Sequence, residues 1–201
     1  MRFRFGELLV FGVFLFAAAV AVIVVVPRGE AAQAGWTQTQ AIQQTRWGPL
    51  SPADRDLLVR VRWAGLWEIP AGRWAQDRAA SEKVKDVGMH LITDHTKLDA
   101  EVRELAAKLG VPLPDQPNPD QRHWLDEMSA SRGADFDRIF ADRLRNAHGK
   151  VFTVVSAVRA GTRNDLIRAF ATRAVNVVMK HMSLLEGTGL VDYSTLPTPS
   201  S

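Results

Sequence analysis

Four long segments of this chain carry apolar residues at helical spacing, and their repetition constrains the fold more than any other feature of the sequence. In the clearest segment, residues 81–110, apolar side chains return every three or four positions and form one stripe along a single helix. His95 stands in the middle of this stripe, where a leucine would be expected, and Asp94 precedes it. The apolar members of the stripe are Val84, Gly88, Leu91, Leu98, Val102, Leu105 and Leu109. A polar residue also lies on the stripe of each other segment, so we expect an all-α domain with polar groups in its core.

Capping residues mark where the helices begin. Ser51 can cap the first helix and precedes Pro52, which suits the first turn of a helix, and Ser81 is expected to cap the second helix. Thr162 is expected to cap the last helix, with Asp165 three residues further on as in a capping box. The predicted helices span roughly residues 51–80, 81–110, 134–160 and 162–187.

The connections predict how the helices are arranged. Short turns join the first helix to the second and the third to the fourth. The longer connection, residues 111–133, begins with a proline-rich stretch and then carries a predicted short helix at 120–130. We expect this connection to cap one end of the bundle. The pattern predicts an antiparallel up-down four-helix bundle over residues 51–187.

Four polar side chains fall at similar heights in this predicted bundle. Counted from the two short turns, which an up-down bundle places at the same end, Glu68, His95 and His148 lie within about 5 Å of one level at ~1.5 Å per residue. His181 lies roughly 10 Å higher by the same count, although turn geometry and helix tilt would absorb part of the gap. We therefore expect one carboxylate and up to three imidazoles to converge in the core.

Two interpretations of this cluster remain open, because buried polar groups must bind one another, a water molecule or a metal. In the first, Glu68, His95, His148 and His181 hold a single Zn, Cu or Fe ion, and Asp94 contacts a ligand from outside. In the second, the cluster is a hydrogen-bonded network. Glu68 then binds one or two histidines, while Asp94 orients a ring or pairs with a surface arginine.

Several classes of site are absent from the sequence. The chain has no cysteine, which excludes disulfides, thiolate metal sites and cysteine catalysis. It has no Glu-x-x-His motif, two of which the usual di-iron centre of a helical bundle needs. The net charge of +3 comes with interleaved acidic and basic residues, so nucleic acid is not an expected partner. We can name no pair of nucleophile and base, and the sequence therefore predicts no reaction.

Trp63, Trp67 and Trp74 form a second stripe on the first helix, well over 90° from its apolar stripe at ~100° per residue. Because tryptophans are usually buried, packing against a neighbouring helix or the linker is the favoured interpretation. If the three rings are exposed, they mark a surface for an envelope protein partner or for the membrane.

An apolar run near the N-terminus predicts export. After Arg2 and Arg4, nineteen apolar residues would extend roughly 28 Å as a helix, enough to cross the hydrocarbon core of a bilayer. The early arginines favour a cytoplasmic N-terminus and an extracytoplasmic domain. We interpret residues 1–26 as a single-pass signal anchor in the cell membrane, with a cleaved signal peptide and secretion as the alternative. Residues 27–50 are then a flexible linker, and residues 188–201 a disordered tail.

Several short stretches together resemble a known family. They are Glu68-Ile69, Val84-Lys85, Met89, Asp94-His95-Thr96, Phe136-Asp137, His148 and His181. Over roughly residues 51–187 the chain is similar to a bacterial ferritin-like domain family of unknown function, whose members are often labelled predicted outer membrane proteins. The resemblance implies a ferritin-like four-helix bundle exported in bacteria, with the glutamate and three histidines at the family's polar positions. It implies no established activity.

Two functions are compatible with these observations. The first is metal binding, or metal-linked redox protection, in the cell envelope. The second is a non-catalytic structural or interaction module of the envelope. In that case the polar cluster gives the core specificity or pH sensitivity, and the tryptophan stripe or the linker contacts a partner.

Overall fold

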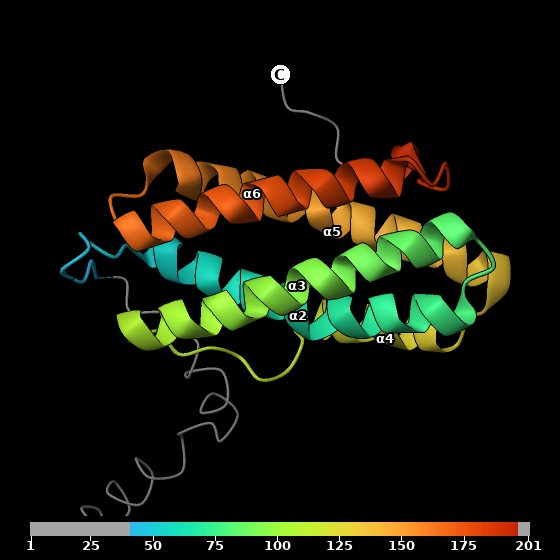
Figure 1. The fold of residues 1–201 in the computed structure, drawn as a ribbon, viewed down its shortest axis with the longest axis horizontal. Coiled ribbons are helices and arrows are strands. Elements are labelled where there is room, and N and C mark those ends of the chain that lie inside the picture. Colours follow the sequence, from blue (N-terminus) through green and yellow to red (C-terminus); the bar gives the residue numbers. More distant parts are fainter. Residues whose placement is uncertain (1–40, 197–201) are drawn as a thin grey trace, which may run out of the picture. The chain divides into compact units, whose positions relative to one another are not determined.

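The computed structural model describes residues 41–196 as an all-helical bundle, which confirms the predicted all-α class. The four long helices, which lie along one another in Figure 1, are α2 (Pro52–Arg78), α3 (Glu82–Leu109), α5 (Gly133–Gly161) and α6 (Asp165–Glu186). A shorter helix, α4 (Pro119–Ser129), lies in the connection between α3 and α5, and a 3-10 turn, η1 (Tyr193–Thr195), follows α6. Residues 41–196 contain no β-strand.

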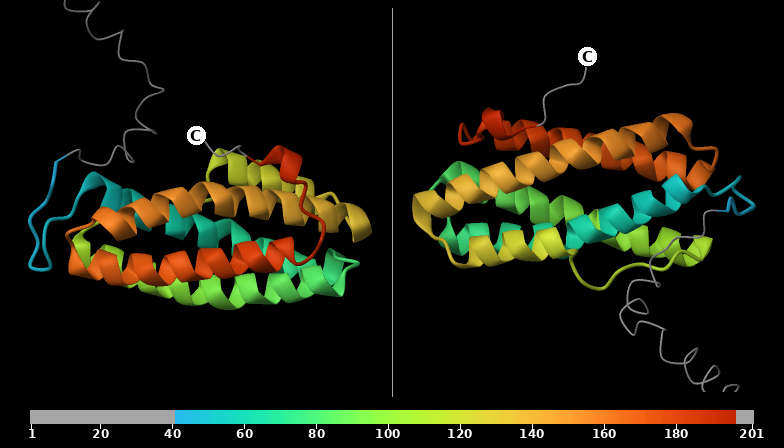
Figure 2. Two further views of the ribbon diagram at one scale, coloured as in Figure 1. Left: turned by 90° about the horizontal axis from the view of Figure 1, so that it is seen from above. Right: turned by 180° about the vertical axis from the view of Figure 1, so that it is seen from behind.

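The order of the helices differs from the predicted up-down arrangement. α2 and α6 run in one direction, whereas α3 and α5 both run in the other (Figures 1 and 2). Gly133, at the start of α5, forms a β-bridge with Ala79, which follows the end of α2. At the opposite end, Gly161 and Thr162 line a pocket together with Ser51, which precedes α2. The two short turns therefore lie at opposite ends of the bundle, and the predicted up-down order is wrong.

The connection between α3 and α5 accounts for this difference, because it crosses the bundle from one end to the other and does not cap one end. α4 packs against both α2 and α5 along this route. The ring of Trp124 lies 5.1 Å from that of Trp67, centroid to centroid, and Met128 is fully buried. Burial of these apolar side chains along the flank of the bundle favours the crossing route.

The apolar core has two parts, one towards each end of the bundle. Leu57 and Phe170 are fully buried in the first part, and Leu91 and Phe136 in the second. The polar positions on the four apolar stripes lie between the two parts, one on each long helix. The polar groups are thus held in the middle of the bundle, with apolar layers above and below.

Two glycines let α2 and α3 approach closely. A Cβ atom on Gly72 would lie 2.6 Å from the carbonyl oxygen of Gly88, and a Cβ atom on Gly88 would lie 2.9 Å from the carbonyl oxygen of Gly72. No side chain fits at these distances, so glycine at both positions permits the backbone contact. The close pairing positions Glu68 on α2 beside His95 on α3, about one and two turns from the contact respectively.

The predicted helix starts are confirmed for α2 and α3 and wrong for α6. Ser51 caps α2 in a capping box. Ser81 precedes α3, although its side chain makes no capping hydrogen bond. α6 begins at Asp165 and is capped by Asn164, not by Thr162. The Asn164 side chain accepts a hydrogen bond from the first turn of the helix, and it also donates one to a backbone carbonyl of the segment before α2.

Parts of the predicted organisation lie outside residues 41–196. These parts are the signal anchor (residues 1–26), most of the linker (residues 27–40) and the end of the tail (residues 197–201). Among the helices of residues 41–196, none is long and apolar enough to cross a membrane.

Candidate metal centre

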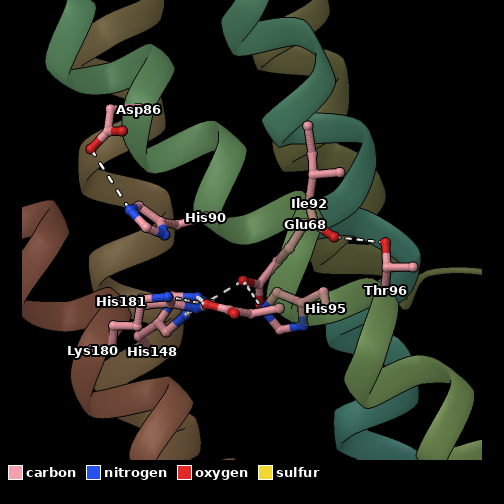
Figure 3. Close-up of polar contacts among 10 residues, drawn as sticks. Glu68, Asp86, His90, Ile92, His95, Thr96, His148, Lys180 and His181 are labelled. Carbon is pink, nitrogen blue, oxygen red and sulfur yellow. Dashed lines mark hydrogen bonds and ion pairs between the residues drawn. The ribbon is translucent and has the colours of Figure 1, made fainter.

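Glu68, His95, His148 and His181 meet in the middle of the bundle, one from each long helix (Figure 3). Each offers one ligand atom, and these four atoms all lie within 4.8 Å of one another. The four residues are between 0% and 4% exposed. The sequence-based prediction that these four side chains converge is confirmed.

The predicted height of His181 is corrected by the structure. Because α6 begins at Asp165, His181 lies three residues nearer to the start of its helix than was expected. The height of His148 was counted from the wrong end of the bundle. Because His148 lies near the middle of α5, its height is nearly the same from either end. Because α6 begins at the end of the bundle where α2 also begins and where α3 and α5 end, the four heights are counted from that end, and all four residues share one level.

Glu68 lies between two of the histidines. Its Oε2 atom is 2.8 Å from Nε2 of His95 and 3.4 Å from Nε2 of His148. The first distance is short, but this contact is an ion pair without hydrogen-bond geometry, and neither Glu68 Oε2 nor His95 Nε2 has another hydrogen-bond partner. Nδ1 of His95 is also buried without a partner. The Glu68–His95 contact is a buried ion pair whose hydrogen-bonding capacity is not satisfied.

The outer nitrogens of the other two rings are engaged by acceptors. Nδ1 of His148 lies 2.8 Å from the carbonyl oxygen of Leu144, one turn earlier on α5. Nε2 of His181 lies 3.0 Å from Oδ2 of Asp94 on α3. Since a carbonyl and a carboxylate only accept hydrogen bonds, both outer nitrogens must carry the ring proton. In the neutral rings the inner nitrogens then bear lone pairs, and these two atoms face each other at 3.1 Å.

Asp94 contacts the ring of His181, as predicted for a residue that orients one of the histidines. Besides accepting from His181, its Oδ2 atom accepts a hydrogen bond of 2.7 Å from Nζ of Lys180. The expected surface arginine is therefore a lysine, on the same helix as His181. The Leu144 carbonyl was not predicted, although its spacing of four residues from His148 on one helix is a usable signal.

The four members of the cluster have pKa values shifted in different directions, so they differ in charge. Burial raises the pKa of Glu68, but the charges of His95 and then His148 outweigh it and lower the pKa to about 2. Burial lowers the pKa of His95, and the Glu68 carboxylate outweighs that effect and raises it. Burial lowers the pKa of His148, although the charge of Glu68 acts in the opposite direction. Burial, and then the charges of His148 and His95, lower the pKa of His181 to about 3. Near neutral pH, His148 and His181 are therefore neutral, with their inner lone pairs free.

These shifts predict that the metal-free chain is acid-sensitive. Between pH 6.5 and pH 3 the unfolded chain binds a proton at His181 that the folded chain does not, so stability falls as the pH falls. His148 acts in the same direction, and Glu68 adds to the loss between its ordinary value of 4.5 and about 2. The raised pKa of His95 opposes this, since its contribution is present at acidic pH and lost as the pH rises through its folded pKa.

We expect the free energy of unfolding to drop by about 2 kcal/mol between pH 7 and pH 5 because of His181 alone. Urea unfolding at several pH values, with a chelator present, measures the drop. His181→Gln should flatten the pH dependence, whereas His123→Gln, at a histidine whose side chain is 70% exposed, should leave it unchanged. If the free energy of unfolding falls equally steeply with pH in the wild type and in His181→Gln, the prediction is contradicted.

The tryptophan stripe on α2 does not form one exposed surface. Trp67 is only 1% exposed and packs against Trp124 of α4, and Trp74 packs partly buried against the second part of the core. Trp63 is half-buried and lines a pocket with Trp67 and Trp124. The favoured interpretation, packing against a neighbouring helix, is confirmed for Trp67. The alternative, a partner surface formed by Trp63, Trp67 and Trp74, is wrong for Trp67 because that ring is buried. The packing helix is α4, whose position the sequence did not predict.

The fold and the site together define a class of protein, namely a helical bundle with a buried cluster of one glutamate and three histidines that could hold a metal ion. Residues 39–187 match the model of the family described as "Domain of unknown function (DUF4142)". Since the match covers most of the chain, the protein belongs to this family. Comparisons with curated proteins and with solved structures give no match.

Proposed function

We propose that the protein binds one transition-metal ion through Glu68, His95, His148 and His181. The observation that carries the proposal is the 3.1 Å contact between the inner nitrogens of His148 and His181. Their outer partners, Leu144 and Asp94, set the tautomers so that two lone pairs face each other. Such a contact is repulsive unless a proton or a cation binds between the two atoms, and the lowered pKa values of both rings disfavour the proton.

The donor set and its spacing support this proposal. Three imidazole nitrogens and one carboxylate oxygen suit Zn, Cu or Fe, whereas Ca and Mg prefer oxygen ligands. Around a tetrahedral ion with bonds of ~2.0–2.2 Å, neighbouring ligand atoms lie roughly 3.3–3.6 Å apart. Three of the six separations between ligand atoms here measure 2.8, 3.1 and 3.4 Å, and all four atoms lie within 4.8 Å of one another, so adjustment of the side chains would admit an ion.

The outer contacts of the histidines also match those of metal ligands. Histidines that bind metals usually donate their second ring proton to a backbone carbonyl or a carboxylate, which fixes the ring orientation. His148 does so to Leu144, and His181 does so to Asp94. A bound ion would in addition engage Glu68 Oε2 and one nitrogen of His95, which are buried without hydrogen-bond partners.

The biological setting is also a proposal. The order of the helices, with one long crossing connection between two helix pairs, is that of ferritin-like folds, and it supports the ferritin-like resemblance. The apolar run in residues 1–26 supports a membrane-anchored, extracytoplasmic domain. We therefore propose a role in metal handling or redox protection at the cell envelope.

Elemental analysis of the full-length chain tests the metal proposal. The untagged chain is purified without chelators from the membrane fraction. The proposed anchor predicts that the chain is found in that fraction. We expect about one Zn, Cu or Fe ion per chain, as for a single four-ligand site. A free ion at a hundred times its Kd should raise the Tm by about 5–10 °C. His181→Ala should lose both effects, and the matched control His123→Ala should keep both.

Two outcomes would contradict parts of the proposal. If no metal copurifies and none of the three ions changes the Tm, the cluster is a structural hydrogen-bond network and the second function, a non-catalytic module, is favoured. If the chain is found only in the soluble fraction, the membrane anchor is wrong while the metal site remains testable.

A further inference from the structure

A pocket reaches the polar cluster from the side of the bundle, between α2, α4 and α5. Its volume is about 180 Å³. Glu68 contributes to its lining, together with residues from the middle of α2, the first half of α4 and the middle of α5. The metal proposal does not use this pocket, and a molecule bound in it would lie against the cluster.

Three indole rings, those of Trp63, Trp67 and Trp124, line the pocket. Trp67 and Trp124 pack against each other with their ring planes tilted by 59°, and Trp67 is almost fully buried. Because packing holds Trp67 and Trp124 in place, this part of the apolar wall exists before any ligand binds. Aromatic walls of this kind favour a flat, apolar ligand body.

The two oxygens of Glu68 have different surroundings. Oε2 faces the histidines and is fully buried. Oε1 accepts no hydrogen bond from residues 41–196, and it is not fully buried. Since Glu68 lines the pocket, Oε1 is the oxygen through which it meets the pocket. A carboxylate oxygen accepts hydrogen bonds only, and a ligand beside it must present an O–H or N–H group.

The charges around the pocket argue against a cationic or an anionic ligand. Arg60 and Lys150 line it, but so do Asp120 and Glu68, so neither sign is in excess. Arg60 is in addition paired with Asp56 at 2.6 Å. A free organic cation would gain no net attraction, and an anion would be placed beside the Glu68 carboxylate. A neutral hydrogen-bond donor avoids both costs.

We propose that this pocket binds a small neutral aromatic molecule with a hydroxyl group, of the phenol type, whose ring packs on the tryptophans and whose O–H donates to Glu68 Oε1. The proposal goes beyond metal binding and does not depend on it, because pocket and carboxylate are present without an ion. If a metal is bound through Oε2, the ligand would lie on the opposite side of the same carboxylate.

Indole NMR signals of the full-length chain test this proposal with phenol as the probe. In the metal-free chain, phenol should shift the indole N–H signals of Trp63, Trp67 and Trp124 saturably, while those of Trp47 and Trp74, which do not line the pocket, stay in place. Toluene lacks the hydroxyl group and should bind about tenfold more weakly, the cost of one lost hydrogen bond. Trimethylphenylammonium, a cation, should also bind more weakly than phenol.

Filling the pocket provides the matched variants. Ala147→Phe introduces a ring at a lining position of α5 and should abolish the phenol shifts, whereas Ala160→Phe, at an exposed position of the same helix, should not change them. If Ala147→Phe fails to fold, Trp63→Leu removes one half-buried wall and should weaken phenol binding. Absence of saturable shifts in the wild type, equal binding of toluene, or unchanged binding in the filled or wall variant overturns the proposal. Because these measurements use the metal-free chain, their failure is separate from failure of the metal proposal.

Discussion

Replacing His95 by leucine is expected to destabilise the metal-free chain by about 3–5 kcal/mol, the usual cost of leaving one member of a buried ion pair without its partner. Glu68 is 3% exposed, and its low pKa depends first on the charge of His95. Without that charge the carboxylate must either stay ionised in an apolar core or take up a proton. Equilibrium unfolding in urea with a chelator present measures the loss.

The double variant Glu68→Leu/His95→Leu separates the ion pair from general damage to packing. Removing both members leaves no unpaired charge, so much of the lost stability should return. Lys108→Leu is the control for an exposed pair, since Lys108 and Glu104 form an ion pair on the surface of α3 and its loss should cost far less than the loss of the buried pair. If His95→Leu costs no more than Lys108→Leu, Glu68 is not ionised in the folded chain, and the electrostatic account of the cluster is wrong.

Replacing Asp94 by alanine is expected to weaken metal binding by about 10–100-fold, the usual effect of removing a group that orients a metal-binding histidine. The 3.0 Å contact from His181 Nε2 to Asp94 Oδ2 holds the ring proton on the outer nitrogen and so keeps the inner nitrogen available. Without the carboxylate, the His181 ring is free to adopt the other tautomer. Competition with a chelator of known affinity measures the change in Kd.

Two further variants make the Asp94 result specific. Asp94→Asn keeps an oxygen that accepts from His181 and should recover part of the affinity. Lys180→Ala removes the other partner of Asp94 but leaves the hydrogen bond to His181, so it should have little effect on Kd. Equal metal affinity of the wild type and Asp94→Ala, with both chains folded, would show that Asp94 does not position a ligand.

Local sequence patterns were sufficient to predict the helices and the members of the cluster. The spacing of apolar residues reports which face of a helix is buried, and that face depends only on the helical period. A polar residue on such a face must enter the core, so Glu68, His95, His148 and His181 were identifiable one helix at a time. The predicted heights were also robust for His148, because it lies near the middle of a long helix.

The start of α6 shows where local patterns fail. Thr162 and Asp165 have the spacing of a capping box, but the chain uses Asn164, whose side chain also binds the segment before α2. That segment is more than a hundred residues away in sequence, so no local pattern reports it. The resulting shift of three residues, about 4.5 Å along the helix, removes part of the predicted offset of His181. The rest disappears because the turn before α6 lies at the other end of the bundle from the turn between α2 and α3.

The sequence by itself determined an all-α chain with four amphipathic helices and one polar interruption on each, because the helical period places those residues on a buried face. Only the tertiary structure decided the direction of α5, which helix covers Trp67 and the opening of a pocket onto Glu68. All three depend on the route of the long connection and on the packing of α4 against α2 and α5. The tautomers of His148 and His181 were likewise decided by the acceptors that packing places behind each ring, a carbonyl on the same helix and a carboxylate on another.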